Sequence, residues 1–250
     1  GNIIELIEKD DIPKYLLFLE NAFPYMDNYN YHKGMNGIIQ ELKCLLKTKS
    51  IGTDSDRALL LDFQATLETI PEKAIKLEED ALAQIETITV DNARLVSNLH
   101  ANLGGLYRMN GHPDLAREHM EKSISLLDQF NLLHINDSIP QIANYAMFLT
   151  EQQEPERGIS ELQKLSGIIK EYHSDDCLDY AKVQETLGTI YLMTANLPQA
   201  KTHFKRAFKI YEKIWADEPE MIEAKYQEIQ ELYPQIGFCI GKNLSGLLTK

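Results

Sequence analysis

The chain has 250 residues, of which 44% are hydrophobic and 25% charged, which is enough apolar material for a packed core. Its net charge is −13, from 25 basic and 38 acidic residues, and this disfavours nucleic acids and anionic membranes as partners because both need a basic face. No apolar run approaches the roughly 20 residues of a membrane span, and no signal peptide is visible. The three cysteines form no metal-type pair, which favours a reducing, cytoplasmic setting.

Residues 1–52 are expected to form a degenerate N-terminal helical hairpin. Its first helix is expected over 10–23, where an acidic start with a proline in the first turn favours helix initiation and a second proline ends it. Residues 24–34 are interpreted as an irregular loop. Apolar residues at helical spacing then predict a helix over 36–47.

Helical pairs follow at a regular interval from residue 53 onward. The run Thr53-Asp54-Ser55-Asp56 is expected to cap a helix over 55–69, and Pro71 to open its partner, which should run to Ile88. The expected repeat ranges are 53–90, 91–132, 133–176 and 177–216, with a partial unit over 217–233 and a capping helix over 234–250. No alternating strand pattern of any length occurs, so the fold class is predicted to be all-α.

The interval is 42 residues, as the positions of Pro71, Pro113 and Pro155 show. Small residues recur in the same register on both helices of a pair: Gly104, Ala146 and Gly188 on the first helix, and Ala74, Ala116, Gly158 and Ala200 on the second. Two helices approach closely only where the crossing residues are small, so these columns predict the contact line of each hairpin.

The stretch Leu103-Gly104, Tyr107, Gly111 and Ala116 resembles the tetratricopeptide repeat. Because the common repeat has about 34 residues, these longer units are more similar to those of kinesin light chains and of the C-terminal arms of signalling NTPases. The resemblance implies a right-handed α-solenoid of stacked antiparallel hairpins, in which the first helices line a concave face. It also implies an interaction scaffold that binds a protein or peptide.

The resemblance also implies where a peptide would bind. Long-unit families carry an asparagine just before the Leu-Gly pair that hydrogen-bonds a peptide backbone, and Asn102 and Asn144 hold that place. Helical spacing around them adds the other candidates: Asn98, Gly105, Arg108, Met109, Met147, Glu151, Lys182, Glu185 and Thr189. Few of these residues are positively charged. The bound segment is therefore expected to use apolar anchors, and not a C-terminal carboxylate clamped by basic residues. Alternatively, the asparagines are merely solvated or cap loops, and the inner wall is unoccupied.

No catalytic, metal or cofactor residues are predicted, since HExxH, GxSxG, P-loop and dinucleotide motifs do not occur. Two other functions stay open. The chain starts without an initiator methionine, so it is expected to be part of a longer protein, in which it could be the sensor arm of a signalling NTPase. It could also be a peptide-regulated phosphatase or transcription regulator, for which Gln40 is the nearest catalytic candidate. The partner and the oligomeric state are left open.

Overall fold

The computed structural model describes residues 14, 16, 17, 19, 32–49 and 52–232. The chain divides into two compact units, Gly1–Phe130 and Asn131–Lys250. The predicted capping helix over 234–250 and most of the predicted helix over 10–23 lie outside the described residues.

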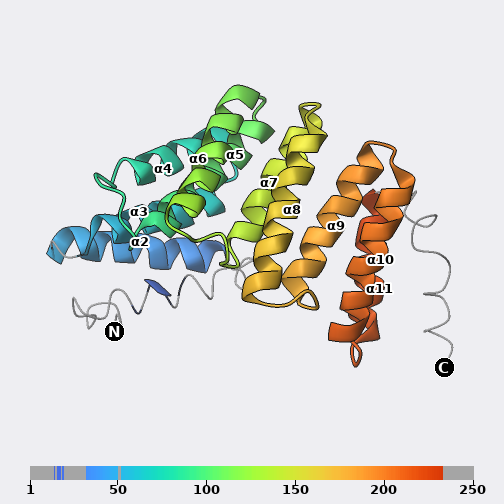
Figure 1. The fold of residues 1–250 in the computed structure, drawn as a ribbon. Helices are drawn as coiled ribbons and strands as arrows, with labels where there is room; N and C mark the ends of the chain where they lie inside the picture. Colours follow the sequence, from blue (N-terminus) through green and yellow to red (C-terminus); the bar gives the residue numbers. More distant parts are fainter. Residues whose placement is uncertain (1–13, 15, 18, 20–31, 50–51, 233–250) are drawn as a thin grey trace. The chain divides into compact units, whose positions relative to one another are not determined.

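The first unit consists of helices that pack against their neighbours in chain order (Figure 1). They are α2 (His32–Lys49), α3 (Asp54–Leu67), α4 (Pro71–Leu82), α5 (Ala93–Met109) and α6 (Pro113–Gln129). One apolar cluster joins α2 and α3 to residues near the N-terminus and includes Leu16, Leu19, Ile39, Leu42 and Phe63. Burial of these side chains, at about 25 cal/mol per Å² of apolar area, attaches α2 to the first hairpin.

Two helix boundaries differ from the prediction. Helix α2 begins at His32, inside the predicted loop, because Met35 is buried one turn before Ile39 and extends the apolar face. Helix α4 ends at Leu82 rather than at Ile88. The residues that follow α4 are rich in β-branched side chains, which lose rotamer freedom in a helix and so favour its early end.

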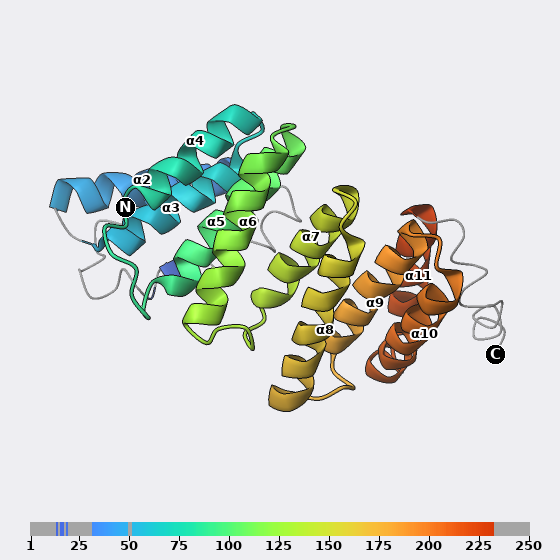
Figure 2. The same cartoon turned by 45° about the horizontal axis from the view of Figure 1, so that its top comes forward.

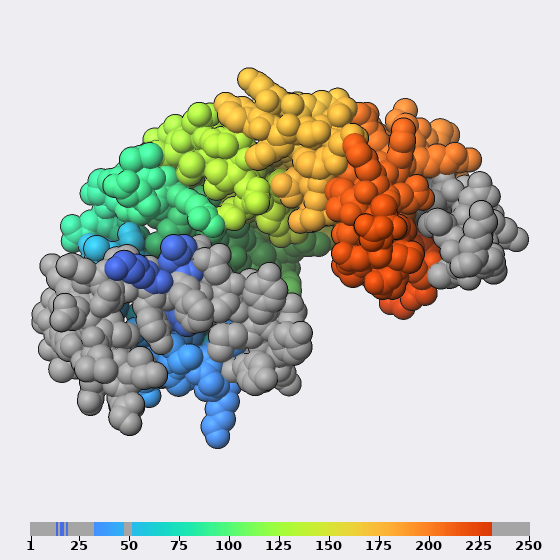
Figure 3. Space-filling view, turned by 90° about the horizontal axis from the view of Figure 1, so that it is seen from below, coloured from blue at the N-terminus to red at the C-terminus, as the bar shows by residue number. Residues whose placement is uncertain are grey.

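The second unit continues the same arrangement (Figure 2). Its helices are α7 (Ser138–Glu151), α8 (Pro155–Tyr172), α9 (Leu178–Met193), α10 (Leu197–Ile214) and α11 (Pro219–Leu232). The first helices of its two hairpins, α7 and α9, also contact each other directly. In the space-filling view these helices, coloured yellow-green to red-orange, form one continuous body (Figure 3).

The helix starts follow the predicted chemistry. Thr53 and Asp56 form a capping box, in which the Thr53 hydroxyl accepts from the Asp56 amide and the Asp56 carboxylate accepts from the Thr53 amide. Pro71, Pro113 and Pro155 are the first residues of α4, α6 and α8, where a missing N–H leaves no hydrogen bond unmade. The 42-residue interval therefore marks the same structural position in three hairpins.

The turn inside each later hairpin is also repeated. Gly111, Gln153 and Ala195 are 42 residues apart and all have positive φ, at 77°, 64° and 57°. Just after each of them, a backbone amide donates back to the carbonyl of the preceding helix: His112 to Tyr107, Glu154 to Leu149 and Asn196 to Tyr191. This is a Schellman-type helix end, and it sets the reversal between the two helices of a hairpin.

The small residues lie at the helix crossings, as predicted. A Cβ added to Gly104 would lie 2.5 Å from Met120 Cγ, and one added to Gly188 would lie 3.0 Å from the Phe204 ring. On the other helix, a Cβ on Gly158 would lie 2.7 Å from the Ala146 carbonyl oxygen. Larger residues would push the paired helices apart at these points.

Candidate functional site

The predicted peptide-binding residues of the first unit all lie on α5. Asn102 and Met109 are exposed, and Asn98, Gly105 and Arg108 are partly buried. Met109 is the most accessible of them, with 75% of its surface exposed. All five lie on one helix, and Asn102 has an additional role within the fold.

The Asn102 side chain donates hydrogen bonds to two carboxyl groups of the preceding hairpin. Its side-chain nitrogen donates to Asp62 Oδ1 on α3 at 2.8 Å and to Glu78 Oε1 on α4 at 3.1 Å. Both amide hydrogens are therefore used inside the protein, and only the amide oxygen is left to bind a peptide. The proposed two-sided hydrogen bond from Asn102 to a peptide backbone would require these internal bonds to break.

Glu78 is a buried carboxyl group next to a second one. Only 2% of its surface is exposed, and its Oε2 atom is buried with no hydrogen-bond partner among the residues that the structure describes. Burial, followed by the nearby Asp62 carboxylate, raises the pKa of Glu78 to about 10. The raised pKa favours the protonated, neutral form of Glu78 at pH 7.

The repeat register shows how unusual this pair is. Asp62 and Glu78 are 42 residues before Gly104 and Met120, the two residues in contact at the crossing of the next hairpin. The following hairpins have Ala146 with Leu162 and Gly188 with Phe204 at these positions. Sequence reasoning missed the carboxyl pair, although comparison of the repeat columns would have revealed two acids in an otherwise apolar position.

A second polar contact joins α5 to α6. His100 Nδ1 lies 3.0 Å from His119 Nδ1, so one imidazole donates and the other accepts. The His119 ring also packs against Tyr107, with 5.4 Å between the ring centroids. Burial lowers the pKa of His100 to about 4 and also lowers the pKa of His119, which keeps both rings neutral at pH 7.

The same contact recurs two repeats later with one residue exchanged. His203 Nδ1 on α10 lies 2.9 Å from Gln184 Oε1 on α9, and the His203 ring stacks on Tyr191 at 5.3 Å. These residues are 84 positions after His119, His100 and Tyr107, which is twice the 42-residue interval. His100, His119 and His203 therefore serve hairpin packing, and Gln184 takes the place of one histidine.

In the second unit, the predicted site residues lie on two helices that contact each other. Asn144, Met147 and Glu151 are on α7, while Lys182, Glu185 and Thr189 are on α9. Asn144, Glu151 and Lys182 are exposed, and the other three are partly buried. We call these six residues the α7/α9 face.

The charge of Glu185 is held within the fold. Its carboxylate accepts from the Tyr211 hydroxyl at 2.6 Å and pairs with Lys225 Nζ at 3.0 Å. It thereby joins α9 to α10 and α11. Lys182 is 3.8 Å from Asp179 in the same helix, a loose surface pair that contributes little to stability.

Other kinds of site are not indicated in the described part of the chain. Over residues 32–49 and 52–232 no group of His, Cys, Asp or Glu side chains is arranged to hold a metal ion. No helix among the described residues is both long and apolar enough to cross a membrane. Gln40 is exposed on α2.

Comparison with known proteins agrees with this architecture. Residues 138–213 match the family described as tetratricopeptide repeat. None of the curated proteins matches the sequence. The crystal structure of BtubC (BKLC) from P. vanneervenii is similar, with a TM-score of 0.59 and 16% identity over 95% of this chain and 92% of that one. A kinesin light chain-like protein of Podospora anserina with nearly identical TPR-like repeats has a TM-score of 0.61 and 13% identity, over 81% of this chain and 98% of that one.

The fold is therefore all-helical, with helices stacked in antiparallel pairs as in tetratricopeptide solenoids. Residues 138–213 match the tetratricopeptide repeat, and the fold of the chain resembles kinesin light chain-like arrays, in agreement with the resemblance inferred from the 42-residue register. Repeats of this class generally mediate protein–protein interactions.

Proposed function

We propose that the chain is a non-catalytic interaction module that binds a protein segment on the α7/α9 face. The exposed side chain of Asn144 carries this proposal. It lies on a helix that contacts α9, and among the described residues the structure gives it no internal hydrogen-bond partner. A free amide can donate to and accept from one peptide unit, which is what an extended segment requires.

The rest of the face supplies complementary groups. Met147 and Thr189 are partly buried, so a ligand can cover apolar surface there without a large rearrangement. Glu151 and Lys182 are exposed and offer charges of opposite sign. A bound segment should therefore combine apolar anchors with mixed polar groups.

The α5 residues are proposed as a separate, weaker binding surface within the first unit. Met109 offers an exposed apolar group, and the amide oxygen of Asn102 can accept a hydrogen bond. Because the amide nitrogen of Asn102 is already used, we expect Asn102 to contribute less binding energy than Asn144.

Selection of peptides on the purified chain from a random library, followed by fluorescence anisotropy, tests the proposal. Asn144→Ala should weaken the selected peptide about tenfold, as expected when a buried backbone hydrogen bond is lost. Gln163→Ala, an exposed change on α8, is the matched control and should leave affinity unchanged. Equal affinity of the selected peptides for wild type and Asn144→Ala would contradict the site.

A further inference from the structure

Helix α10 has a charge opposite to that of the whole chain. It contains five basic residues and one acidic residue, although the net charge of the protein is −13. Lys201, Lys205, Lys209 and Lys213 follow one another at intervals of four residues, and Arg206 lies beside them. Residues four apart lie along one side of a helix, so these five form a continuous line, which we call the basic stripe.

The basic stripe plays no part in the core. All five residues are exposed, whereas the other side of α10 is buried. The buried residues are Ala200, Phe204, Ala207, Phe208, Ile210 and Tyr211. The apolar residues alone therefore account for the packing of α10.

The repeat does not impose the basic stripe either. The five equivalent positions of α8, 42 residues earlier, are Ile159, Gln163, Lys164, Gly167 and Glu171. Those of α6, 84 residues earlier, are Arg117, Glu121, Lys122, Ser125 and Gln129. These helices pack in the same way with only one or two basic residues at these five positions, so the charge of α10 is specific to this repeat.

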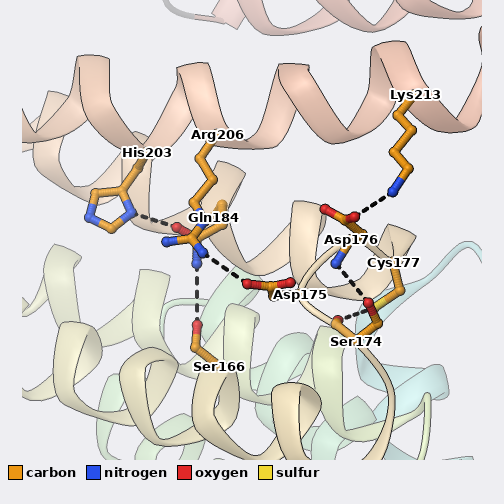
Figure 4. A network of polar contacts seen from close by, with 9 residues as sticks. All are labelled: Ser166, Ser174, Asp175, Asp176, Cys177, Gln184, His203, Arg206 and Lys213. Atoms are coloured by element: carbon orange, nitrogen blue, oxygen red, sulfur yellow. Dashed lines mark hydrogen bonds and ion pairs between the residues drawn. The ribbon is translucent and has the colours of Figure 1, made fainter.

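The protein's own loop shows that carboxylates bind this surface. Asp175 and Asp176, in the connection between α8 and α9, pair with Arg206 and Lys213 of α10 (Figure 4). Arg206 Nη2 lies 3.4 Å from Asp175 Oδ2, and its guanidinium carbon lies 4.9 Å from the centre of the Tyr180 ring. The α8–α9 loop thus neutralises two members of the stripe.

The other three members are available. In the part of the chain that the structure describes, Lys201, Lys205 and Lys209 are exposed and form no ion pair. At 1.5 Å per residue, successive lysines are separated by about 6 Å along the helix axis. An acidic helix with carboxylates at every fourth residue has the same repeat distance.

We propose that the basic stripe binds an acidic protein segment whose carboxylates lie along one side of a helix. The remaining surface of the chain is acidic and would repel a uniformly charged polyanion, whereas a segment that is acidic on one face only can bind the stripe without this cost. The stripe lies on α10, apart from the six residues of the α7/α9 face, so this second contact is independent of the function proposed above.

Fluorescence anisotropy with a labelled alanine-based helical peptide, bearing glutamate at every fourth position, tests the inference on the full chain. The triple change Lys201→Gln, Lys205→Gln and Lys209→Gln should weaken binding about tenfold, the sum expected for three exposed charge pairs. The same lysines changed to arginine should retain binding, since the charge is kept. Affinity should also fall with added salt.

A matched control removes the same charge elsewhere. Lys33→Gln, Lys73→Gln and Lys122→Gln change exposed lysines of α2, α4 and α6 and should leave affinity within about twofold of wild type. If both triple variants weaken binding equally, the effect is one of net charge and the stripe is not the site. If a single-stranded oligonucleotide binds the stripe more tightly than the peptide, the assignment to an acidic protein segment is wrong.

Discussion

Asp62 Oδ1 and Glu78 Oε1 accept hydrogen bonds from the same nitrogen, Asn102 Nδ2, at 2.8 and 3.1 Å. The two acids are on α3 and α4, and the amide is on α5, so this contact joins the first hairpin to the second. In later hairpins the equivalent contact is a small residue against a large apolar one. The first hairpin thus has a polar bridge at the place where later hairpins have apolar packing.

Glu78→Gln should stabilise the protein at neutral and alkaline pH. The folded-state pKa of Glu78 is raised from 4.5 to about 10, so the folded form binds a proton that the unfolded form releases. Its contribution is fully present below pH 4.5 and is lost as the pH rises toward about 10. Between pH 4.5 and pH 7 this effect lowers the free energy of unfolding by at most about 3 kcal/mol. A glutamine keeps the shape and does not ionise.

Urea unfolding at about pH 5 and about pH 8 measures this effect. The ionisation of Glu78 should lower the free energy of unfolding of the wild type at the higher pH. Glu78→Gln should remove much of this difference between the two pH values. Glu72→Gln, an exposed change on the same helix, is the control and should follow wild type. An unchanged pH dependence in Glu78→Gln would show that Glu78 is ionised in the folded protein.

His100→Gln should make the first unit more resistant to acid. The pKa of His100 is lowered from 6.5 to about 4 in the folded state, so stability is present above pH 6.5 and is lost as the pH falls toward about 4. The free energy of unfolding falls by at most about 3 kcal/mol as the pH is lowered through this range. Glutamine should fit because Gln184 already makes this contact with His203 at 2.9 Å.

Thermal unfolding between about pH 7 and pH 4.5 tests the histidine prediction. The melting temperature of His100→Gln should fall less than that of wild type over this range. His119 also has a lowered pKa, so part of the acid sensitivity should remain. His173→Gln, which changes an exposed histidine, should behave like wild type, and the same behaviour in His100→Gln would contradict the assignment.

Two glycines of α8 should respond in opposite ways to the same change. A Cβ on Gly158 would lie 2.7 Å from the backbone oxygen of Ala146, whereas one on Gly167 would have nothing within 4 Å. Gly158→Ala should therefore cost about 1–3 kcal/mol through overpacking. Gly167→Ala should gain about 0.5–1 kcal/mol from helix propensity. Chemical denaturation measures the free energy of unfolding of both variants. A loss of stability in both would show that close helix packing at Gly158 is not the cause of its effect.

Ala195→Gly should stabilise the turn between α9 and α10. Ala195 has a φ of 57°, a left-handed conformation that costs residues with a side chain roughly 1 kcal/mol and that Gly111 adopts in the equivalent turn. We expect a gain of up to about 1 kcal/mol, measured by urea unfolding. Ala83→Gly, at an ordinary φ of −66°, is the matched control and should destabilise the protein. If Ala195→Gly is as destabilising as the control, the turn is not strained.

The local features of the fold could be predicted from the sequence because they depend on residues close together in the chain. Pro71 and Pro113 mark helix starts through their fixed φ, and Gly104 marks a close crossing through its lack of a side chain. The early end of α4 was missed because the apolar pattern continues to Ile88, while the helix itself stops at Leu82. For the site, the sequence could predict that Asn102 and Asn144 occupy equivalent places, and their use by a peptide stays a prediction.

By itself, the sequence determined the helical pairs, the 42-residue interval and the likeness to tetratricopeptide repeats, because periodic patterns and turn residues act over a few positions each. Only the tertiary structure decided what Asn102 does. Its hydrogen bonds reach residues 40 and 24 positions away, across two helices of another hairpin. Such a contact depends on how hairpins are packed together, which no local pattern of residue types specifies.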